Sequence, residues 1–447
     1  MSNRPAHLPR TTHLPSTDQL TRRSMLRLMG LGAGAVTLGS LAACAPSGGT
    51  SPAPAATTGG AAEDFSFSSW SLSEENPKPV IEGLMSTFGA DKGVTISPVS
   101  YPYNEYLNQL TLQTRGGQFS GAAQVDVAWL GSLAALGKLQ DLSGLAEGRG
   151  YTDAALAASR YDGAQYGLPW TIGAIGLVTN TELLEKVGIS EVPSGIEDFE
   201  AALLELKGIG GGVIPYAAST KVAQLKDILI WMQTFGSPLV EDGTVTIGDD
   251  ASVEAVTWYK KLYDQGLIAP DVDRFDARAL FSQGKAAIYD DAIVGRGAVV
   301  ADSPDPDFES KLAPASRPVL AAGDDPRAFV WGHAVVVVDG PGAGTAAEFA
   351  QWITSDTTAT TGFFDELGLP PTTEAALTSE TVTNDTFTKD FGDKITATAT
   401  TNPFWAFPQY AQVEAVIAEK VQAVLVGSSD AATAMREAGE QAQALLG

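Results

Sequence analysis

The sequence contains little cysteine, little histidine and few basic side chains. Its 447 residues include one cysteine and three histidines, and 28 lysines and arginines stand against 53 acidic residues, for a formal net charge of −25. A single cysteine excludes an internal disulfide framework and any multi-cysteine zinc or iron–sulfur site. The shortage of basic residues argues against nucleic acid as a partner, because polyanions need a lysine and arginine surface. We expect neither a metal site nor a cofactor.

Histidine chemistry has one candidate in the body of the chain. His7 and His13 lie in the proline- and threonine-rich start of the sequence, which leaves His333. A lone histidine is most often a structural imidazole whose hydrogen bonds are satisfied inside the protein. We expect that role for His333, and catalysis by imidazole is not predicted.

The first 43 residues have the pattern of an export signal. Arg22 and Arg23 precede an uncharged, glycine- and alanine-rich run over residues 28–43. Paired arginines before such a run match the twin-arginine signature, and the run is short for a membrane-spanning helix. The run ends with the letters LAAC, which resemble a bacterial lipobox. Cys44 is therefore predicted to carry a lipid anchor.

The segment after Cys44 is rich in small residues. Residues 45–63 contain no large apolar side chain. A segment of this composition buries too little surface to dock, so we predict that residues 44–63 are the lipidated cysteine and a flexible tether. The resulting layout is an anchor, a tether and a body at the outer face of the cytoplasmic membrane.

The body alternates between strand-like and helix-like segments. Near-continuous apolar runs at residues 125–130, 174–179 and 329–338 are typical of buried strands in parallel sheets. Helical spacing of apolar residues occurs between them, for example over residues 252–265. This alternation over about 380 residues predicts an α/β protein with largely parallel sheets. No internal repeat and no second long linker interrupts it, which favours two lobes that share the chain.

Several motifs of the body occur in a family-specific order. They are YGLPW at 166–170 followed by LVTNTELLEKVGI at 177–189, YxxGLIxP at 263–270, FxxGKAAI at 281–288 and GLPP at 368–371. In this order and spacing, residues 65–446 resemble the carbohydrate-type extracellular solute-binding proteins of bacterial ABC importers, the family-1 group that includes maltose-binding protein.

The resemblance implies a two-lobed periplasmic-binding-protein-like (type II) fold with hinge crossings near residues 171–173, 330–333 and 385–400. The amino-terminal lobe would comprise residues 64–172 and about 331–385, and the carboxyl-terminal lobe residues 173–330 and about 386–447. Such a protein is a monomer and not an enzyme. It captures a sugar or oligosaccharide between its lobes and delivers it to the membrane permease by hinge closure.

Candidate ligand-binding residues follow from where ligands bind in open α/β sheets, at the carboxyl ends of strands and between lobes. Aromatic rings pack on the apolar face of a pyranose, and carboxylates bond its hydroxyl groups. The positions that combine these side chains with such places are Trp70, Tyr101, Tyr103, Trp129, Trp170, Asp290, Asp291, Trp331 and Trp405. The other three tryptophans (Trp231, Trp258 and Trp352) have core-like spacing in predicted helices.

Other functions remain open at this point. Acidic and aromatic side chains also suit a polyamine or another small solute. A secreted polysaccharide-active enzyme would use paired carboxylates, which the sequence supplies in abundance. The sequence lacks a Gly-x-Ser-x-Gly elbow and a Walker Lys-Ser/Thr pair, which disfavours two enzyme classes. A sensory lipoprotein with the same fold is a further alternative.

Overall fold

The computed structural model describes residues 53–447. The predicted export signal, Arg22, Arg23 and Cys44 lie outside the described residues. Within residues 53–447, no helix is both long and apolar enough to cross a membrane.

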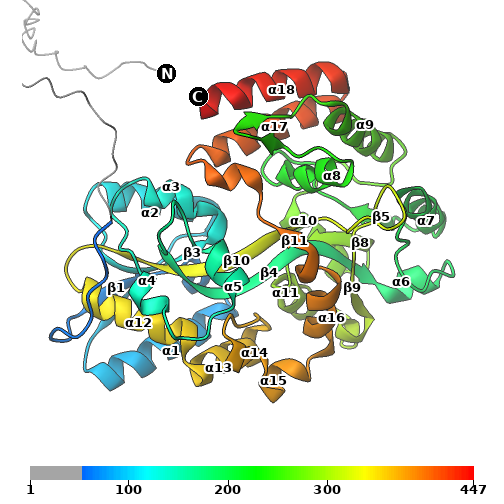
Figure 1. The fold of residues 1–447 in the computed structure, drawn as a ribbon. Helices are drawn as coiled ribbons and strands as arrows, with labels where there is room; N and C mark the ends of the chain where they lie inside the picture. Colours follow the sequence, from blue (N-terminus) through cyan, green and yellow to red (C-terminus); the bar gives the residue numbers. More distant parts are fainter. Residues whose placement is uncertain (1–52) are drawn as a thin grey trace, which may run out of the picture. The chain divides into compact units, whose positions relative to one another are not determined.

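One mixed sheet of nine strands forms the centre of the described body (Figure 1). Its strand order is β2-β1-β3-β10-β4-β8-β5, with β11 paired to β10 and β9 paired to β4. The strands are β1 (Phe65–Ser68), β2 (Ile96–Val99), β3 (Gly121–Asp126), β4 (Gly167–Asn180), β5 (Ile214–Ala217), β8 (Ala286–Asp291), β9 (Leu312–Ala315), β10 (Ala328–Val338) and β11 (Ala399–Thr400). A separate hairpin pairs β6 (Val240–Glu241) with β7 (Thr244–Val245).

The sheet is less parallel than the sequence pattern predicts. β1 pairs in parallel with β2 and β3, and β5 pairs in parallel with β8. β10 is antiparallel to both β3 and β4, and β4 is antiparallel to β8 and β9. Two strands that run in opposite directions through the middle of the sheet impose these antiparallel pairs. The apolar runs predict that these strands are buried on both faces, but they do not predict the direction in which neighbouring strands run.

Helices cover both faces of the amino-terminal half of the sheet. α12 (Ala343–Ser355) packs on one face, where Phe67 and Phe349 meet with ring centroids 5.1 Å apart. α2 (Tyr103–Arg115) packs on the other face through Tyr106 and Leu110. The remaining helices of this half are α1 (Pro77–Lys92), α3 (Leu130–Ala134), α4 (Ser143–Ala146), α5 (Asp153–Ala158), α13 (Thr357–Leu367), α14 (Glu374–Leu377) and α15 (Glu380–Thr383).

The other half is built on β5, β8, β9 and the second part of β4. Trp231 and Trp258 are buried in its core, as their spacing predicts, with ring centroids 4.7 Å apart. Its helices are α6 (Thr181–Glu185), α7 (Ile196–Gly208), α8 (Ile228–Thr234), α9 (Asp250–Asp264), α10 (Arg274–Ser282), α11 (Gly295–Ala301), α16 (Thr386–Lys394), α17 (Tyr410–Leu425) and α18 (Ala431–Leu446). The described residues also form six short 3-10 helices: η1 (Trp70–Ser73), η2 (Val127–Trp129), η3 (Leu225–Asp227), η4 (Phe308–Lys311), η5 (Thr396–Thr398) and η6 (Pro403–Ala406).

Two long strands join the halves. The start of β4 pairs with β10, and the end of β4 pairs with β8 and β9. The start of β10 pairs with β11, and the end of β10 pairs with β3. The residues expected at the first two crossings lie opposite each other, since Trp331 pairs with Gly173 and His333 with Thr171. The strands approach so closely there that a Cβ on Gly332 would lie 2.6 Å from the Thr171 carbonyl oxygen. Only glycine fits this position without displacing the partner strand.

The described part of the predicted tether lies against the body. The Ala56 N–H donates to the Asp141 carbonyl oxygen at 3.0 Å, and the Gly59 N–H donates to Glu348 Oε1 at 3.2 Å. The Glu63 N–H donates to the Thr345 hydroxyl at 2.9 Å. This differs from the expectation of a free segment up to residue 63. Each of these contacts uses a backbone N–H of the segment as its donor, which composition-based reasoning about side chains does not detect.

Candidate functional site

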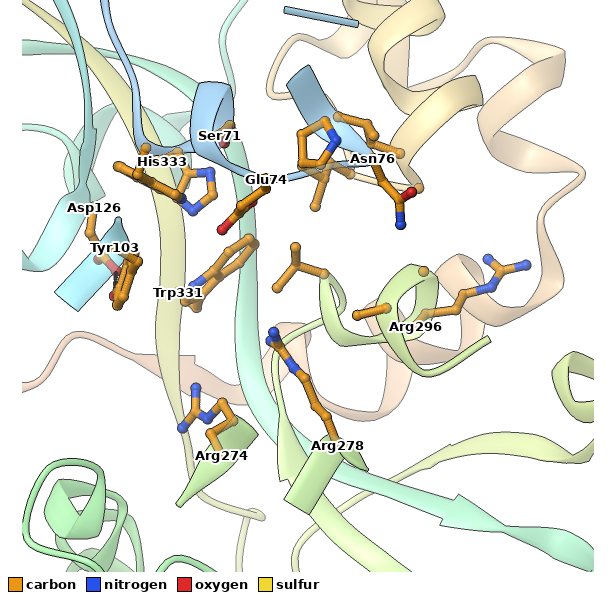
Figure 2. Close-up of a pocket in the computed structure, with 18 of the residues that line it drawn as sticks. Ser71, Glu74, Asn76, Tyr103, Asp126, Arg274, Arg278, Arg296, Trp331 and His333 are labelled. Carbon is orange, nitrogen blue, oxygen red and sulfur yellow. Dashed lines mark hydrogen bonds between the residues drawn. The ribbon is translucent and has the colours of Figure 1, made fainter. Parts of the chain in front are cut away.

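A cavity of about 1400 Å³ lies where the two halves of the sheet face each other (Figure 2). Its walls come from η1, the start of α1, the end of β3, α10, α11, β10, α13, η6 and α17. The volume exceeds that of a typical small-ligand pocket. The walls therefore have room for a solute of several rings.

Aromatic rings form one wall of the cavity. Trp70, Tyr103, Trp331 and His333 all line it. The Trp70 ring lies 5.5 Å from Tyr103 and 4.8 Å from His333, and the Trp331 ring lies 4.5 Å from His333. Trp70 follows β1, and Tyr103 opens α2 after β2. The strand-end rule therefore accounts for both positions.

Buried carboxylates stand beside these rings. Asp126 ends β3 and caps η2, where its Oδ1 accepts from the Ala128 N–H at 3.1 Å and its Oδ2 accepts from the Tyr103 hydroxyl at 3.2 Å. Burial raises the pKa of Asp126, and the nearby Lys226 ammonium opposes that shift. Glu414 on α17 accepts from Asn402 at 2.8 Å. Burial raises the pKa of Glu414 as well.

Trp405 lines the cavity near Glu414. Its indole N–H donates to Glu414 Oε1 at 3.2 Å, which holds the ring at the cavity wall. Both hydrogen bonds to Glu414 use Oε1, so Oε2 keeps its acceptor capacity among the described residues. Trp405 and Trp331 are both half-buried and therefore offer ring surface to a solute.

Arginines occupy the opposite wall. Arg274 and Arg278 lie one turn apart on α10, and Figure 2 shows both side chains rising from that helix toward Trp331. Arg278 donates to Asp291 through Nε at 2.7 Å and Nη2 at 2.9 Å, and Arg274 pairs with Asp227. The two bonds from Arg278 to Asp291 form a fork that fixes the plane of that guanidinium.

Glu74 faces these arginines from the segment after η1 (Figure 2). The surrounding cavity walls shield its carboxyl and raise its pKa, while the charge of Arg278 lowers it. The cavity thus presents donors on one side and carboxylate acceptors on the other.

The structure brings four of the nine predicted ligand-binding residues to the cavity wall: Trp70, Tyr103, Trp331 and Trp405. Trp129 lies behind them, with its ring 5.3 Å from both Trp70 and Tyr103. It therefore supports the aromatic wall instead of lining it.

The two predicted aspartates pair with arginines and do not line the cavity themselves. Asp291 is fully buried and holds Arg278, which lines the cavity. Asp290 is buried and forms an ion pair with Arg317 at 2.6 Å, away from the cavity lining. Tyr101 likewise lies outside the lining and accepts a hydrogen bond from Gln113.

Trp170 lies in the core, outside the cavity lining. Its side chain is 1% exposed and stacks on Phe363 with ring centroids 4.5 Å apart. The pairing of β4 with β10 slips there, since His333 pairs with Thr171 and Ala334 with Pro169, which leaves Trp170 as an extra residue. A bulge of this kind redirects a side chain and leaves no mark in the hydrophobic pattern.

Several lining residues have no strand-end signal. Arg274 and Arg278 belong to a helix, and Glu414 comes from a helix near the end of the chain. Helical spacing of four places the two arginines on one face, but does not show what that face meets. Within residues 53–447, no group of three or more histidine, cysteine or acidic side chains is arranged to hold a metal ion.

Comparison with known proteins gives the family. The model of the bacterial extracellular solute-binding protein family matches residues 83–390. The chain belongs to this family. Membership agrees with the prediction from the motifs, and it classes the chain among binding proteins and not enzymes.

Curated relatives carry equally general descriptions. Binding proteins of Brucella abortus (strain 2308) and Brucella suis biovar 1 (strain 1330) are each 27% identical over 221 residues, which is 47% of this chain and 53% of theirs. The chain thus spans about half the length of the curated relatives it matches.

Solved structures share the fold over most of the chain. The GacH receptor of Streptomyces glaucescens, solved without ligand and with acarbose, has a TM-score of 0.78 at 23% identity, covering 86% of this chain and 98% of its own. Maltose-bound MalE3 of T. maritima has a TM-score of 0.75 at 18% identity, covering 86% and 100%. A Listeria monocytogenes ABC substrate-binding protein in complex with cycloalternan has a TM-score of 0.71 at 17% identity, and the match covers 86% of this chain and 98% of its own. The predicted α/β solute-binding fold is confirmed.

Proposed function

We propose that this family member is the substrate-binding component of an ABC importer and that its solute is a sugar or oligosaccharide. The observation that carries the proposal is the cavity wall, where the half-buried rings of Trp331 and Trp405 stand beside buried hydrogen-bonding groups. A pyranose needs this combination of an apolar platform and polar partners. Solved neighbours with this fold hold acarbose, maltose and cycloalternan, which supports the same class of solute here.

Closure of two lobes is part of the proposal. Residues 64–172 and about 331–385 would form one lobe, and residues 173–330 and about 386–447 the other, with β4 and β10 as connecting strands. The cavity draws its walls from both sets, so a bound solute gains contacts to each lobe as they approach. A permease would then receive the closed form.

Attachment to the membrane is proposed through Cys44. The order of Arg22 and Arg23, the uncharged run and the cysteine supports export followed by lipidation, with the body at the outer face of the cytoplasmic membrane. Labelling of cells with a radioactive fatty acid tests this, since C44A is expected to abolish incorporation and R22K/R23K to block export.

Calorimetry with the full chain tests the solute class. Maltose, acarbose, cycloalternan and α-D-tagatose are titrated beside spermidine. W331A removes a cavity ring and is expected to weaken sugar binding by about 2 kcal/mol, roughly thirtyfold. W352A is the matched control, because Trp352 packs on Phe88 away from the cavity.

The rival functions have their own signatures in these experiments. Binding of spermidine without binding of any carbohydrate would replace the sugar proposal with the polyamine one. Release of reducing ends from polysaccharides would identify an enzyme instead.

A further inference from the structure

His333 has a position that a purely structural imidazole does not require. It follows Trp331 by two residues on β10, so both side chains point to the same face of the sheet. Its ring lies 4.8 Å from that of Trp70 and 4.5 Å from that of Trp331, and both contacts are edge-on. The residue is only 5% exposed, yet it lines the cavity (Figure 2).

The inner ring nitrogen of His333 has a defined partner. Nδ1 lies 3.1 Å from Nε2 of Gln124, a side chain that is itself buried. The carbonyl oxygen of the same Gln124 amide accepts from the Ser69 hydroxyl, and the Ser69 oxygen accepts from the Ser71 N–H. Each donor atom in this chain of bonds therefore has an acceptor.

Rotating the Gln124 amide by about 180° would exchange its oxygen and nitrogen and disrupt this chain of hydrogen bonds. It would aim the amide NH₂ at Ser69 and leave the Ser69 hydroxyl proton without an acceptor in the chain of bonds. The satisfied arrangement makes Gln124 the donor and Nδ1 the acceptor. A neutral imidazole that accepts at Nδ1 carries its proton at Nε2.

The ring is held neutral. Burial lowers the pKa of His333 to about 3. The charged and titratable groups around it are Asp126 at the end of β3, Tyr103 at the start of α2, and Glu74 after η1. Nε2 makes no hydrogen bond to any of the described residues and is not sealed from the cavity.

We infer that His333 is a ligand-binding residue whose Nε2–H is a fixed, neutral donor to an acceptor oxygen of the solute. The inference rests on the proposed function and narrows it, because a hydroxyl, ether or carbonyl oxygen fits this position. An ammonium group, which has only donors, does not. His333 therefore selects solutes with an acceptor oxygen over polyamines at this end of the cavity.

Nuclear magnetic resonance of the free, full-length chain tests the donor without any ligand. Protein labelled with ¹⁵N-histidine shows the ring signals of His7, His13 and His333, and loss of one set in H333Q assigns His333. The expected result at neutral pH is a proton on Nε2 and none on Nδ1. A proton on Nδ1, or on both nitrogens, overturns the inference.

Two amide substitutions separate the two ring nitrogens. Asparagine in H333N keeps a group near Nδ1 for Gln124 but does not reach the cavity, whereas glutamine in H333Q places an N–H near Nε2. Calorimetry with maltose is expected to show a loss of about tenfold for H333N and recovery of most of that loss in H333Q. Thermal unfolding is expected to rank them the other way, with H333Q the less stable.

A merely structural histidine predicts a different result, in which affinity for maltose follows stability and H333N binds as well as the unchanged chain. That outcome also overturns the inference. If maltose does not bind at all, the proposed function fails for this sugar, and the tautomer in the free chain still decides whether the donor exists.

Discussion

Arg317 and Asp290 show what a buried charge does in this protein. Their side chains are 1% and 5% exposed, and Arg317 lies over the Trp231 ring. Asp290→Asn would leave the guanidinium without its counter-charge, which we expect to lower the free energy of unfolding by about 3 kcal/mol. Urea denaturation measures the change.

The control for that experiment is D393N, which breaks a solvent-exposed pair with Lys389. A change of less than about 0.5 kcal/mol is expected there. Equal effects of D290N and D393N would contradict the role assigned to the buried pair.

His333 gives the stability of the chain a pH dependence of known sign. Its folded-state pKa of about 3 lies below the ordinary value of 6.5, so between these values the unfolded state binds the extra proton. The contribution of His333 is complete above about pH 6.5 and is lost as the pH falls toward 3. Between pH 7 and pH 5 the loss is about 2 kcal/mol.

H333Q isolates this contribution, because buried carboxyls with raised pKa values, such as those of Asp126 and Glu414, respond in the opposite direction and remain in both proteins. The difference in unfolding free energy between the two proteins is expected to shrink on acidification. A difference that is constant from pH 7 to pH 5 would show that the ring is not desolvated.

Glycines in the two connecting strands differ in how much space they have. A Cβ on Gly332 would lie 2.6 Å from a backbone oxygen of β4, whereas a Cβ on Gly173 would meet Ile293 at an ordinary 3.5 Å. We expect G332A to lower the unfolding free energy by about 2 kcal/mol and G173A to change it by less than about 0.5 kcal/mol. Thermal or urea unfolding distinguishes them.

The two glycine variants are also expected to differ in sugar binding, because Gly332 lies between Trp331 and His333. Displacement of β10 would move both rings, so G332A is also expected to weaken sugar binding while G173A preserves it. Identical behaviour of the two variants would mean that the strands adjust freely at this point.

Elements were predicted better from the sequence than the contacts between them. Near-continuous apolar runs identified β4 and β10, because a strand buried on both faces is apolar at consecutive residues. The strand predicted over residues 125–130 was mostly wrong: β3 covers Gly121–Asp126, and residues 127–130 form η2 and the start of α3, because an apolar run shows burial and not whether the backbone is extended. The bulge at Trp170 was not predictable, since it depends on the register of a strand more than 150 residues away. Arg274 and Arg278 were missed for the same reason: helical spacing defines a face, and only tertiary packing defines what it meets.

Closure should be visible for the whole molecule. Because the cavity takes walls from both halves of the sheet, a solute that binds both halves is expected to hold them closer together. Small-angle X-ray scattering should therefore show a smaller radius of gyration with maltose than without it. W331A, measured at a maltose concentration too low to fill its weakened site, should show no change.

A radius that stays constant while calorimetry shows maltose bound would rule out hinge closure and leave the carbohydrate assignment intact. A radius that falls equally in W331A would indicate a solvent effect of the sugar.

The central place of β10 also has a consequence for how the chain is made. β10 lies between β3 and β4, although about 200 residues separate it from β3 along the chain. A ribosome has to synthesise about three quarters of the protein before β10 is available to pair with β3 and β4. Until then β3 and β4 each present an unpaired edge, which favours wrong pairing in the nascent chain, and the two strands can be joined only after β10 has been made.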